Sequence, residues 1–492
     1  MLRPLRWRFA ASLALALLVS ACASTESGAP AEPGSAPAPS APVTESAPAD
    51  LGSTTDSEAP ASAAASYGEA DGLSASPAPA EPSGELGALA RRARPEAPRR
   101  QGSRPGLLTA GDVDDNLNWE AFQRYAERAR RSQSRSLPHL DLGERITVRV
   151  VDATGQPVAN AHLTVEATGG SRARRLTTET GTDGRLALFP AYDFGPDVRR
   201  LRVRAQAPGG QGEPVTLGLD ARSGDRTVRV QLRDAVGERP HALDLAVVID
   251  VTGSMGDELR YLTDEFENIV RRVEQRYRGT DLRFALVAYR DHGDDLVVRS
   301  FPFVRSAREM QQRLAGLRAE GGGDYPEAMD EALEAATALD WRTGEVARVA
   351  FLVADAPPHE GAPTERFLGA VRQARAAGVR VYPLAASGVG DEAEYLMRHA
   401  AVLTQARHLF LTDDSGIGHR HQEPKIGCYV VTPLDGLLTR VIASELEGRR
   451  VEPMREEIVR EVGDYDAGVC ESGPVAVRDA LPQQRRGGLG YD

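Results

Sequence analysis

From about residue 241 onward, continuous apolar runs alternate with amphipathic segments, and few folds accommodate such a pattern. Six apolar runs are predicted to be strands: Leu243–Ile249, Leu282–Tyr289, Leu296–Phe303, Val349–Val353, Val379–Ala385 and His408–Leu411. Helices are predicted at Asp257–Tyr277, Ser306–Ala319, Pro326–Leu339, Glu365–Ala377, Glu392–Leu403 and Leu434–Leu446. Strands that are apolar throughout and separated by helices are typical of a parallel sheet covered on both faces. Residues 241–449 are therefore predicted to form a doubly wound, Rossmann-like α/β domain.

Side chains with oxygen ligands follow the strands of this predicted sheet. The first strand runs into Asp250, Thr252 and Ser254, which alternate along a short loop, and Asp355 follows the strand Val349–Val353. In doubly wound sheets, ligands bind beyond the carboxyl ends of the strands, where the strand order switches. One carboxylate and two hydroxyls in the first loop are the oxygen ligands that a hard cation such as Mg²⁺ prefers.

The D-x-T-x-S spacing of the first loop resembles the metal-ion-dependent adhesion site of the von Willebrand factor A (vWA) family, which usually reads D-x-S-x-S. That family adds a Thr from a later loop and an Asp after the fourth strand. Asp355 matches the Asp, and Asp324 stands where the Thr is expected. The resemblance implies a vWA domain that binds Mg²⁺, or Mn²⁺ or Ca²⁺, and that engages a protein or surface ligand.

Asp324 departs from the family pattern. Together with Asp250 and Asp355 it would place three carboxylates around a divalent ion, so that the local charge is about −1 rather than about zero. An acidic partner is then attracted less, and a neutral or basic partner, or an ion capped by water, is favoured. Asp324 also precedes Pro326 and has Glu327 three residues later, which is an arrangement typical of a helix cap. The two roles are compatible.

Asp291 and His292, which follow the second predicted strand, and His359, which lies four residues beyond Asp355, are candidates for the rim of the same site. A loop that is simply rich in polar residues explains them equally well.

We predict a binding protein rather than an enzyme. Ser254 is not part of a G-x-S-x-G nucleophile elbow, because Thr252 stands two residues before it. The loop also lacks the lysine of a phosphate-binding loop. Two alternatives stay open: a metal-assisted hydrolase that uses Asp291 or His359 as its base, and a structural envelope protein with a vestigial metal site.

Residues 1–22 are predicted to be an export signal, since arginines precede an apolar run that is too short to span a membrane. The run ends in Val19-Ser20-Ala21-Cys22, which resembles the bacterial lipobox. This resemblance implies a lipidated Cys22 that anchors the protein to the cell envelope, and Ala23 favours the outer membrane. An ordinary secretory signal with an incidental cysteine is the alternative.

Residues 23–105 are rich in Ala, Pro, Ser and Gly and have almost no large apolar side chains, so they are predicted to be a disordered linker. Residues 106–137 are predicted to hold a turn-like acidic segment up to Asp115 and then a lead helix, Asn116–Arg131, that docks on the next domain. Residues 450–492 show no clear core pattern and are assigned to a C-terminal tail.

Short alternating strands between Gly and Asp turns predict a β-sandwich over residues 144–233. The order V-x-D, G-x-P-V, A-x-L-x-V, T-D-G resembles carboxypeptidase-regulatory-like domains. The motif residues are strand and turn formers, so the resemblance implies a fold and no chemistry.

The 59 basic and 71 acidic side chains give a net charge of −12, which argues against a nucleic-acid partner held by a global positive field. The three cysteines exclude a scaffold built on disulfides. In an exported chain, Cys428 and Cys470 either form a disulfide or remain two separate thiols.

Overall fold

The computed structural model describes residues 108–132, 137–168, 174–323, 325–415, 423–424 and 426–470. The predicted export signal, Cys22, the whole of the predicted linker (23–105) and Asp324 lie outside these residues. No helix in the described ranges is long and apolar enough to span a bilayer.

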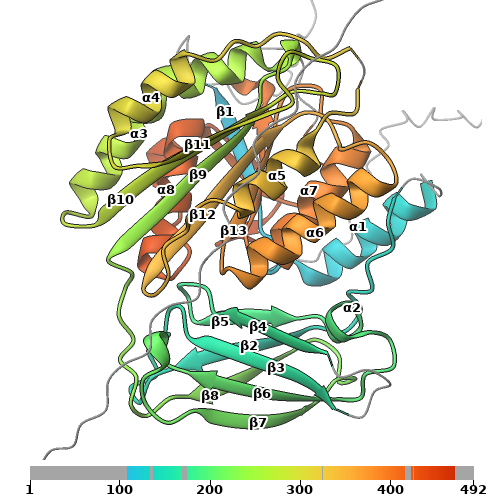
Figure 1. Ribbon diagram of the computed structural model, residues 1–492, viewed down its shortest axis with the longest axis vertical. Coiled ribbons are helices and arrows are strands. Elements are labelled where there is room, and N and C mark those ends of the chain that lie inside the picture. Colours follow the sequence, from blue (N-terminus) through green and yellow to red (C-terminus); the bar gives the residue numbers. More distant parts are fainter. Residues whose placement is uncertain are drawn as a thin grey trace, which may run out of the picture. The chain divides into compact units, whose positions relative to one another are not determined.

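A nine-stranded mixed sheet forms the centre of the larger domain (Figure 1). Its strands are β1 (Thr109–Val113), β9 (Ala242–Asp250), β10 (Asp281–Tyr289), β11 (Val298–Val304), β12 (Val346–Ala354), β13 (Arg380–Ala385), β14 (His408–Thr412), β15 (Tyr429–Pro433) and β16 (Arg460–Val462). The order across the sheet is β11-β10-β9-β12-β13-β14-β1-β15-β16. The neighbours from β10 to β14 are parallel, while β11, β1 and β16 run antiparallel to the strands beside them.

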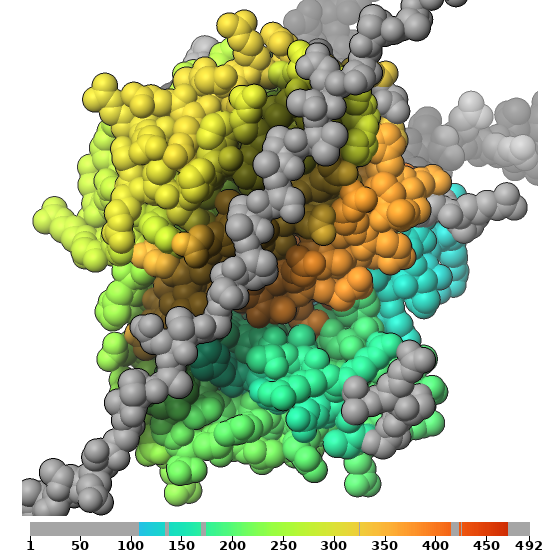
Figure 2. Space-filling model, in the orientation of Figure 1, coloured from blue at the N-terminus to red at the C-terminus, as the bar shows by residue number. Residues whose placement is uncertain are grey.

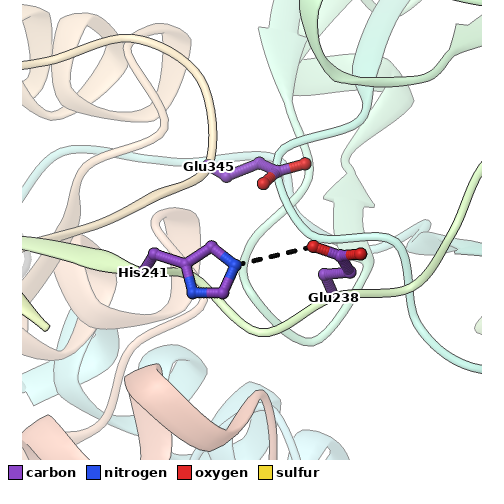
Figure 3. A group of neighbouring side chains, drawn as sticks. All are labelled: Glu238, His241 and Glu345. Atoms are coloured by element: carbon purple, nitrogen blue, oxygen red, sulfur yellow. Dashed lines mark ion pairs between the residues drawn. The ribbon is translucent and has the colours of Figure 1, made fainter. Parts of the chain in front are cut away.

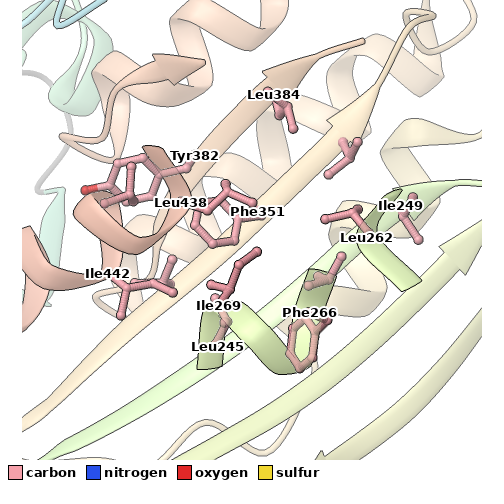
Figure 4. Packing of buried hydrophobic residues seen from close by; sticks show 14 of the residues in the cluster. Leu245, Ile249, Leu262, Phe266, Ile269, Phe351, Tyr382, Leu384, Leu438 and Ile442 are labelled. Carbon is pink, nitrogen blue, oxygen red and sulfur yellow. The ribbon is translucent and has the colours of Figure 1, made fainter. Parts of the chain in front are cut away.

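Helices cover both faces of this sheet because successive side chains of the central strands point to opposite sides. Leu245 and Val247 of β9 belong to one hydrophobic cluster, and Ala246 and Val248 belong to another. The first cluster is closed by α3 (Gly256–Arg276), α4 (Ala307–Ala315) and α8 (Leu434–Glu447), and Figure 4 shows its packing. The second is closed by α5 (Met329–Thr337), α6 (Ala362–Ala376), α7 (Asp391–Leu403) and α1 (Trp119–Ser132). The predicted α/β class is confirmed.

β1 corrects the prediction of a turn-like segment before Asp115, since Thr109–Val113 form a strand. Ala110 pairs with Leu411 of β14 on one side and with Thr432 of β15 on the other. Gly111 is required there, since a Cβ atom would lie 2.6 Å from the Phe410 ring. The buried Asp112 is tolerated because Arg450 and Arg407 offset the effect of burial and lower its pKa to about 2.

The segment between α1 and β9 folds into a smaller domain of two sheets. Its strands are β2 (Ile146–Val151), β3 (His162–Thr168), β4 (Arg175–Glu179), β5 (Arg185–Leu188), β6 (Arg200–Gln206), β7 (Val215–Asp220) and β8 (Arg226–Gln231), and α2 (Pro190–Phe194) follows β5. The sheets have the orders β5-β2-β8 and β4-β3-β6-β7, and they share one hydrophobic cluster. We call it the two-sheet domain. Since β1 precedes it and β9 follows it, it is inserted into the α/β domain.

Buried ion pairs join the two-sheet domain to the α/β domain, and the two meet along a continuous boundary at the right of the space-filling view (Figure 2). Arg375 of α6 pairs with Asp193 of α2. Arg348 of β12 pairs with Glu179 of β4 at 2.7 Å. Trp119 of α1 also packs on Phe189, with ring centroids 5.7 Å apart.

The start of the predicted C-terminal tail is part of the folded structure. β16 extends the main sheet, and β17 (Tyr465–Asp466) pairs with β18 (Val469–Cys470). Cys428 and Cys470 form a disulfide, with Cα atoms 5.3 Å apart. The Cys470 N–H donates to Asn118 Oδ1 at 2.8 Å, so this segment also contacts the residues just before α1.

Candidate metal centre

The predicted site residues meet at one edge of the sheet, where the strand order reverses. β9 lies between β10 and β12, and these three strands are parallel. Asp250 is the last residue of β9, Asp355 directly follows β12, and Asp291 lies two residues beyond β10. The topology therefore brings their side chains to the crevice in which doubly wound sheets bind ligands.

The loop after β9 forms a network of carboxylate and hydroxyl oxygens. Asp250 Oδ1 accepts hydrogen bonds from the Thr252 N–H at 2.8 Å and from the Thr252 hydroxyl at 2.7 Å. Thr252 Oγ1 lies 3.4 Å from Ser254 Oγ, and Ser254 bonds the Asp355 carboxylate. A short 3₁₀ turn, Gly253–Met255, leads from this loop into α3. The four side chains thus form one connected group.

One side-chain oxygen of Asp250 accepts no hydrogen bond from any described residue. Its side chain is fully buried, and Oδ2 has no hydrogen-bond partner. Burial, together with the negative charge of Asp355, raises the pKa of Asp250 to about 7, and burial raises the pKa of Asp355 as well. Buried carboxylates without a counter-charge destabilise a fold, and a cation removes this penalty. The residues present therefore fit a divalent ion.

Glu327 joins this group and was not predicted as a site residue. It is 4% exposed, and Oε2 has no partner among the described side chains. Burial, with Asp250 and Asp291 nearby, raises its pKa to about 9. It lies against the loop before α5, since a Cβ atom on Gly322 would be 2.9 Å from Glu327 Oε1 and 3.0 Å from Thr252 Cβ. The sequence signal lies in G-G-G-D-Y-P-E, a pattern that predicts a helix cap at Asp324, whereas α5 begins at Met329 with Ala328 as its N-cap.

The three predicted rim residues also lie together. His359 Nε2 is 2.8 Å from Asp291 Oδ1, and the rings of His292 and His359 have centroids 6.2 Å apart. Asp294, beside them, accepts a hydrogen bond from the Gly322 N–H at 3.0 Å, which ties the rim to the loop at 321–323. Asp324, the predicted substitute for the family's Thr, lies outside the described residues.

An exposed aromatic ring borders this edge. Tyr325 is 46% exposed, and its hydroxyl oxygen accepts a hydrogen bond from the Gly390 N–H at 2.6 Å. The bond joins the loop before α5 to the loop before α7 and holds the ring at the surface. Tyr325 thus offers an apolar surface to a partner.

A second group of possible metal ligands lies at the other end of the strands. Glu238, His241 and Glu345 have ligand atoms within 4.8 Å of one another (Figure 3). They precede β9 and β12, whereas Asp250 and Asp355 follow the same strands. All three side chains are exposed, and exposed acidic groups of this kind are well solvated without an ion.

The fold and this oxygen-rich edge define a doubly wound domain with a cation-type site, and part of this domain matches a known family model. Residues 244–382 match the model of the von Willebrand factor A domain. The matched range begins in β9 and ends in β13, so it contains Asp250, Thr252, Ser254 and Asp355. The chain therefore contains a vWA domain.

Two curated relatives match part of the chain. An ariadne-like RING finger protein of Acanthamoeba polyphaga mimivirus is 35% identical over 117 residues, which is 24% of this chain and 11% of that protein. The alpha-protein kinase vwkA of Dictyostelium discoideum is 28% identical over 120 residues, again 24% of this chain and 19% of that protein. The chain thus spans less than a fifth of each relative.

Solved structures with some likeness include two bacterial proteins. The pilus adhesin SpaC from Lactobacillus rhamnosus GG, in its open conformation, is 13% identical, with 42% of this chain and 28% of that chain covered and a TM-score of 0.28. The conserved hypothetical protein BatB from Bacteroides thetaiotaomicron is 16% identical, with 44% and 92% covered and a TM-score of 0.23.

Proposed function

We propose that the vWA domain binds a divalent cation, Mg²⁺ or alternatively Mn²⁺ or Ca²⁺, through Asp250, Thr252, Ser254 and Asp355. The observation that carries this proposal is the buried, unpartnered Oδ2 of Asp250 beside a second carboxylate and two hydroxyls. These are hard oxygen ligands, and their negative charges repel one another unless a cation lies between them.

The bound cation, on this proposal, helps to hold a protein or surface ligand at the same edge. Asp324 and Glu327 would each add a carboxylate near the ion, so that the centre attracts acidic groups less and favours a neutral or basic partner. Tyr325 would supply apolar contact area beside the ion. The vWA family match supports a binding role rather than catalysis.

We further propose that Cys22 is lipidated and anchors the protein in a bacterial cell envelope, at the outer membrane, where it acts in adhesion or in assembly of an envelope complex. The support for this location is the sequence of residues 1–23.

A thermal unfolding experiment tests the cation site. Mg²⁺ or Mn²⁺ should raise the Tm of the full-length protein, since a ligand that binds only the folded state stabilises it. Asp250→Asn keeps an oxygen that can accept the Thr252 hydrogen bonds but removes the charge, so the shift should vanish. Asp340→Asn, an exposed change, is the matched control and should retain the shift. An equal shift in wild type and Asp250→Asn would refute the assigned site.

A second experiment tests the binding role. Crosslinking pull-down from intact cells should recover a partner that is lost with a chelator and lost in Asp250→Asn. The same preparations are assayed for turnover of generic phosphoester and ester substrates. Cation-dependent turnover that disappears in Asp250→Asn would instead assign a metal-assisted hydrolase.

A further inference from the structure

A cavity of about 460 Å³ lies at the other end of the sheet from the metal centre. Its walls include the outward face of β5-β2-β8, the start of β13, the end of α8 and the segment at 448–450. Seven arginines line it: Arg145, Arg149, Arg185, Arg380, Arg407, Arg449 and Arg450. Among the described residues of the lining, only Asp114, Asp183 and Glu445 contribute negative charge. The cavity is therefore unusually rich in guanidinium groups for an acidic protein.

Five of these arginines are neutralised by acidic partners inside or behind the wall. The pairs are Arg145–Asp225, Arg380–Asp183, Arg380–Glu445, Arg407–Asp112, Arg449–Glu447 and Arg450–Asp112. These ion pairs are ordinary structural contacts between the elements that form the walls of the cavity.

Arg149 and Arg185 differ from the other five. They stand directly opposite each other on β2 and β5, on the face away from the hydrophobic cluster of the two-sheet domain. Neither forms an ion pair within the described part of the chain, and Arg149 Nε is buried without a hydrogen-bond partner. Like charges directly opposite on neighbouring strands are destabilising. The positive charge of the cavity is thus concentrated, and left uncompensated, at this pair.

The surroundings of the pair suit an oxyanion attached to an organic molecule. Thr147 of β2 pairs with Thr227 of β8, and Thr147 lies two residues before Arg149, on the same face of the sheet. Both threonines line the cavity, and their hydroxyls can donate hydrogen bonds to an anion. Leu117, Pro157 and Tyr382 supply apolar lining. The volume lies within the range of roughly 300–1,000 Å³ that is typical of small-molecule sites.

We propose that this cavity binds a small organic anion, whose phosphate or carboxylate group lies between Arg149 and Arg185. The planar guanidinium presents paired N–H donors that match the oxygens of either group. A bound anion offsets the repulsion between the two arginines and contacts both domains. Because the cavity and the metal centre lie at opposite ends of the strands, the anion binds independently of the cation.

Calorimetric titration of the metal-free, full-length protein tests this proposal, with inorganic phosphate and succinate as probes and NaCl added to match ionic strength. Phosphate, succinate or both should bind the wild type. R149Q/R185Q should weaken binding at least about tenfold, as expected for loss of charge-assisted hydrogen bonds. R200Q/R204Q, which removes two exposed arginines of β6, is the matched control and should bind like wild type.

The two probes distinguish the chemical class of the bound anion. Binding of phosphate alone assigns a phosphate ester, and binding of succinate alone assigns a carboxylate. R149Q/R185Q should be at least as stable as wild type without anion, since it relieves like-charge repulsion, so a loss of binding is not explained by unfolding. The proposal is overturned if neither probe binds above the NaCl control, or if R149Q/R185Q binds as well as wild type. Asp250→Asn should leave anion binding unchanged, which separates this result from the fate of the cation site.

Discussion

Asp250 and Glu327 show how far the chemistry of the site can be predicted residue by residue. The D-x-T-x-S spacing placed Asp250, Thr252 and Ser254 on one loop, and the structure connects them by hydrogen bonds. Asp355 was predictable because parallel strands end at a common edge. Glu327 was not, since its importance depends on burial and on carboxylates from distant loops, and neither is visible in local sequence.

The substitution Glu327→Gln tests the role of this residue in the cation site. Removing a buried carboxylate whose pKa is raised to about 9 should increase the stability of the metal-free protein at pH 7, by on the order of 1–3 kcal/mol. It should also weaken Mg²⁺ binding about tenfold or more, because Gln cannot supply the negative charge that Glu327 gains when a bound cation lowers its pKa. Denaturant unfolding and Mg²⁺ titration measure the two effects. Glu334→Gln, on the exposed side of α5, should change neither; unaltered Mg²⁺ affinity in Glu327→Gln would restrict that residue to a structural role.

At the scale of elements, most strands and helices of the α/β domain were predictable, whereas β1 was not. β9, β10 and β12 have nine residues each and are mostly apolar, so their pattern was clear. β1 has five residues, Thr-Ala-Gly-Asp-Val, which include a glycine and a charge. Its strand conformation comes from pairing with β14 and β15, which lie some 300 residues later in the chain.

Ala110→Pro tests the importance of β1. A proline removes a backbone donor, and in a strand paired on both edges a ladder hydrogen bond must be lost. Ala110→Gly keeps that donor and should cost only about 1 kcal/mol. Ala110→Pro should cost on the order of 3 kcal/mol or more by urea unfolding. Equal stability of the two variants would mean that β1 contributes little to the α/β domain.

α7 contains a buried histidine that makes stability depend on pH. His399 donates from Nδ1 to the Tyr395 carbonyl and packs on Phe122, and burial lowers its pKa to about 4. The unfolded chain therefore binds more protons than the folded chain between about pH 4 and pH 6.5, and the free energy of unfolding falls as the pH falls through this window.

His399→Leu should remove a contribution of up to about 1.4 kcal/mol per pH unit from that dependence. Urea unfolding from pH 4 to pH 7 measures it as the difference between variant and wild type, because all other groups titrate alike in both. His139→Gln, at an exposed position, should leave the slope unaltered. An unchanged slope in His399→Leu would show that this histidine does not titrate as its burial requires.

The stability of the whole molecule depends on contacts that join the inserted two-sheet domain to the α/β domain. A β-sandwich was predicted for residues 144–233, but the sequence did not show how this segment relates to its neighbours. Arg375 and Asp193 lie 182 residues apart and are each about 5% exposed, so their pairing becomes visible only in the structure.

Asp193→Ala should destabilise the protein by about 3–5 kcal/mol, because Arg375 would remain buried without its partner. A single unfolding transition should shift, since each domain packs on the other. Asp197→Ala, an exposed change nearby, should stay within about 0.5 kcal/mol of wild type. Calorimetry resolves the transitions; two separate transitions in wild type would contradict the coupling.

β1 also determines how mechanical tension enters the protein. Thr109 lies beside Thr412 and Pro433, at the carboxyl ends of β14 and β15, so the chain enters the sheet at the same edge as Asp250. A force on the chain before Thr109 acts first on β1. This strand can separate from the sheet only if its hydrogen bonds to β14 and to β15 break together. The two-sheet domain comes later in the chain and is bypassed by that load. A protein attached through its N-terminal side would therefore resist traction through its central sheet rather than through its inserted domain.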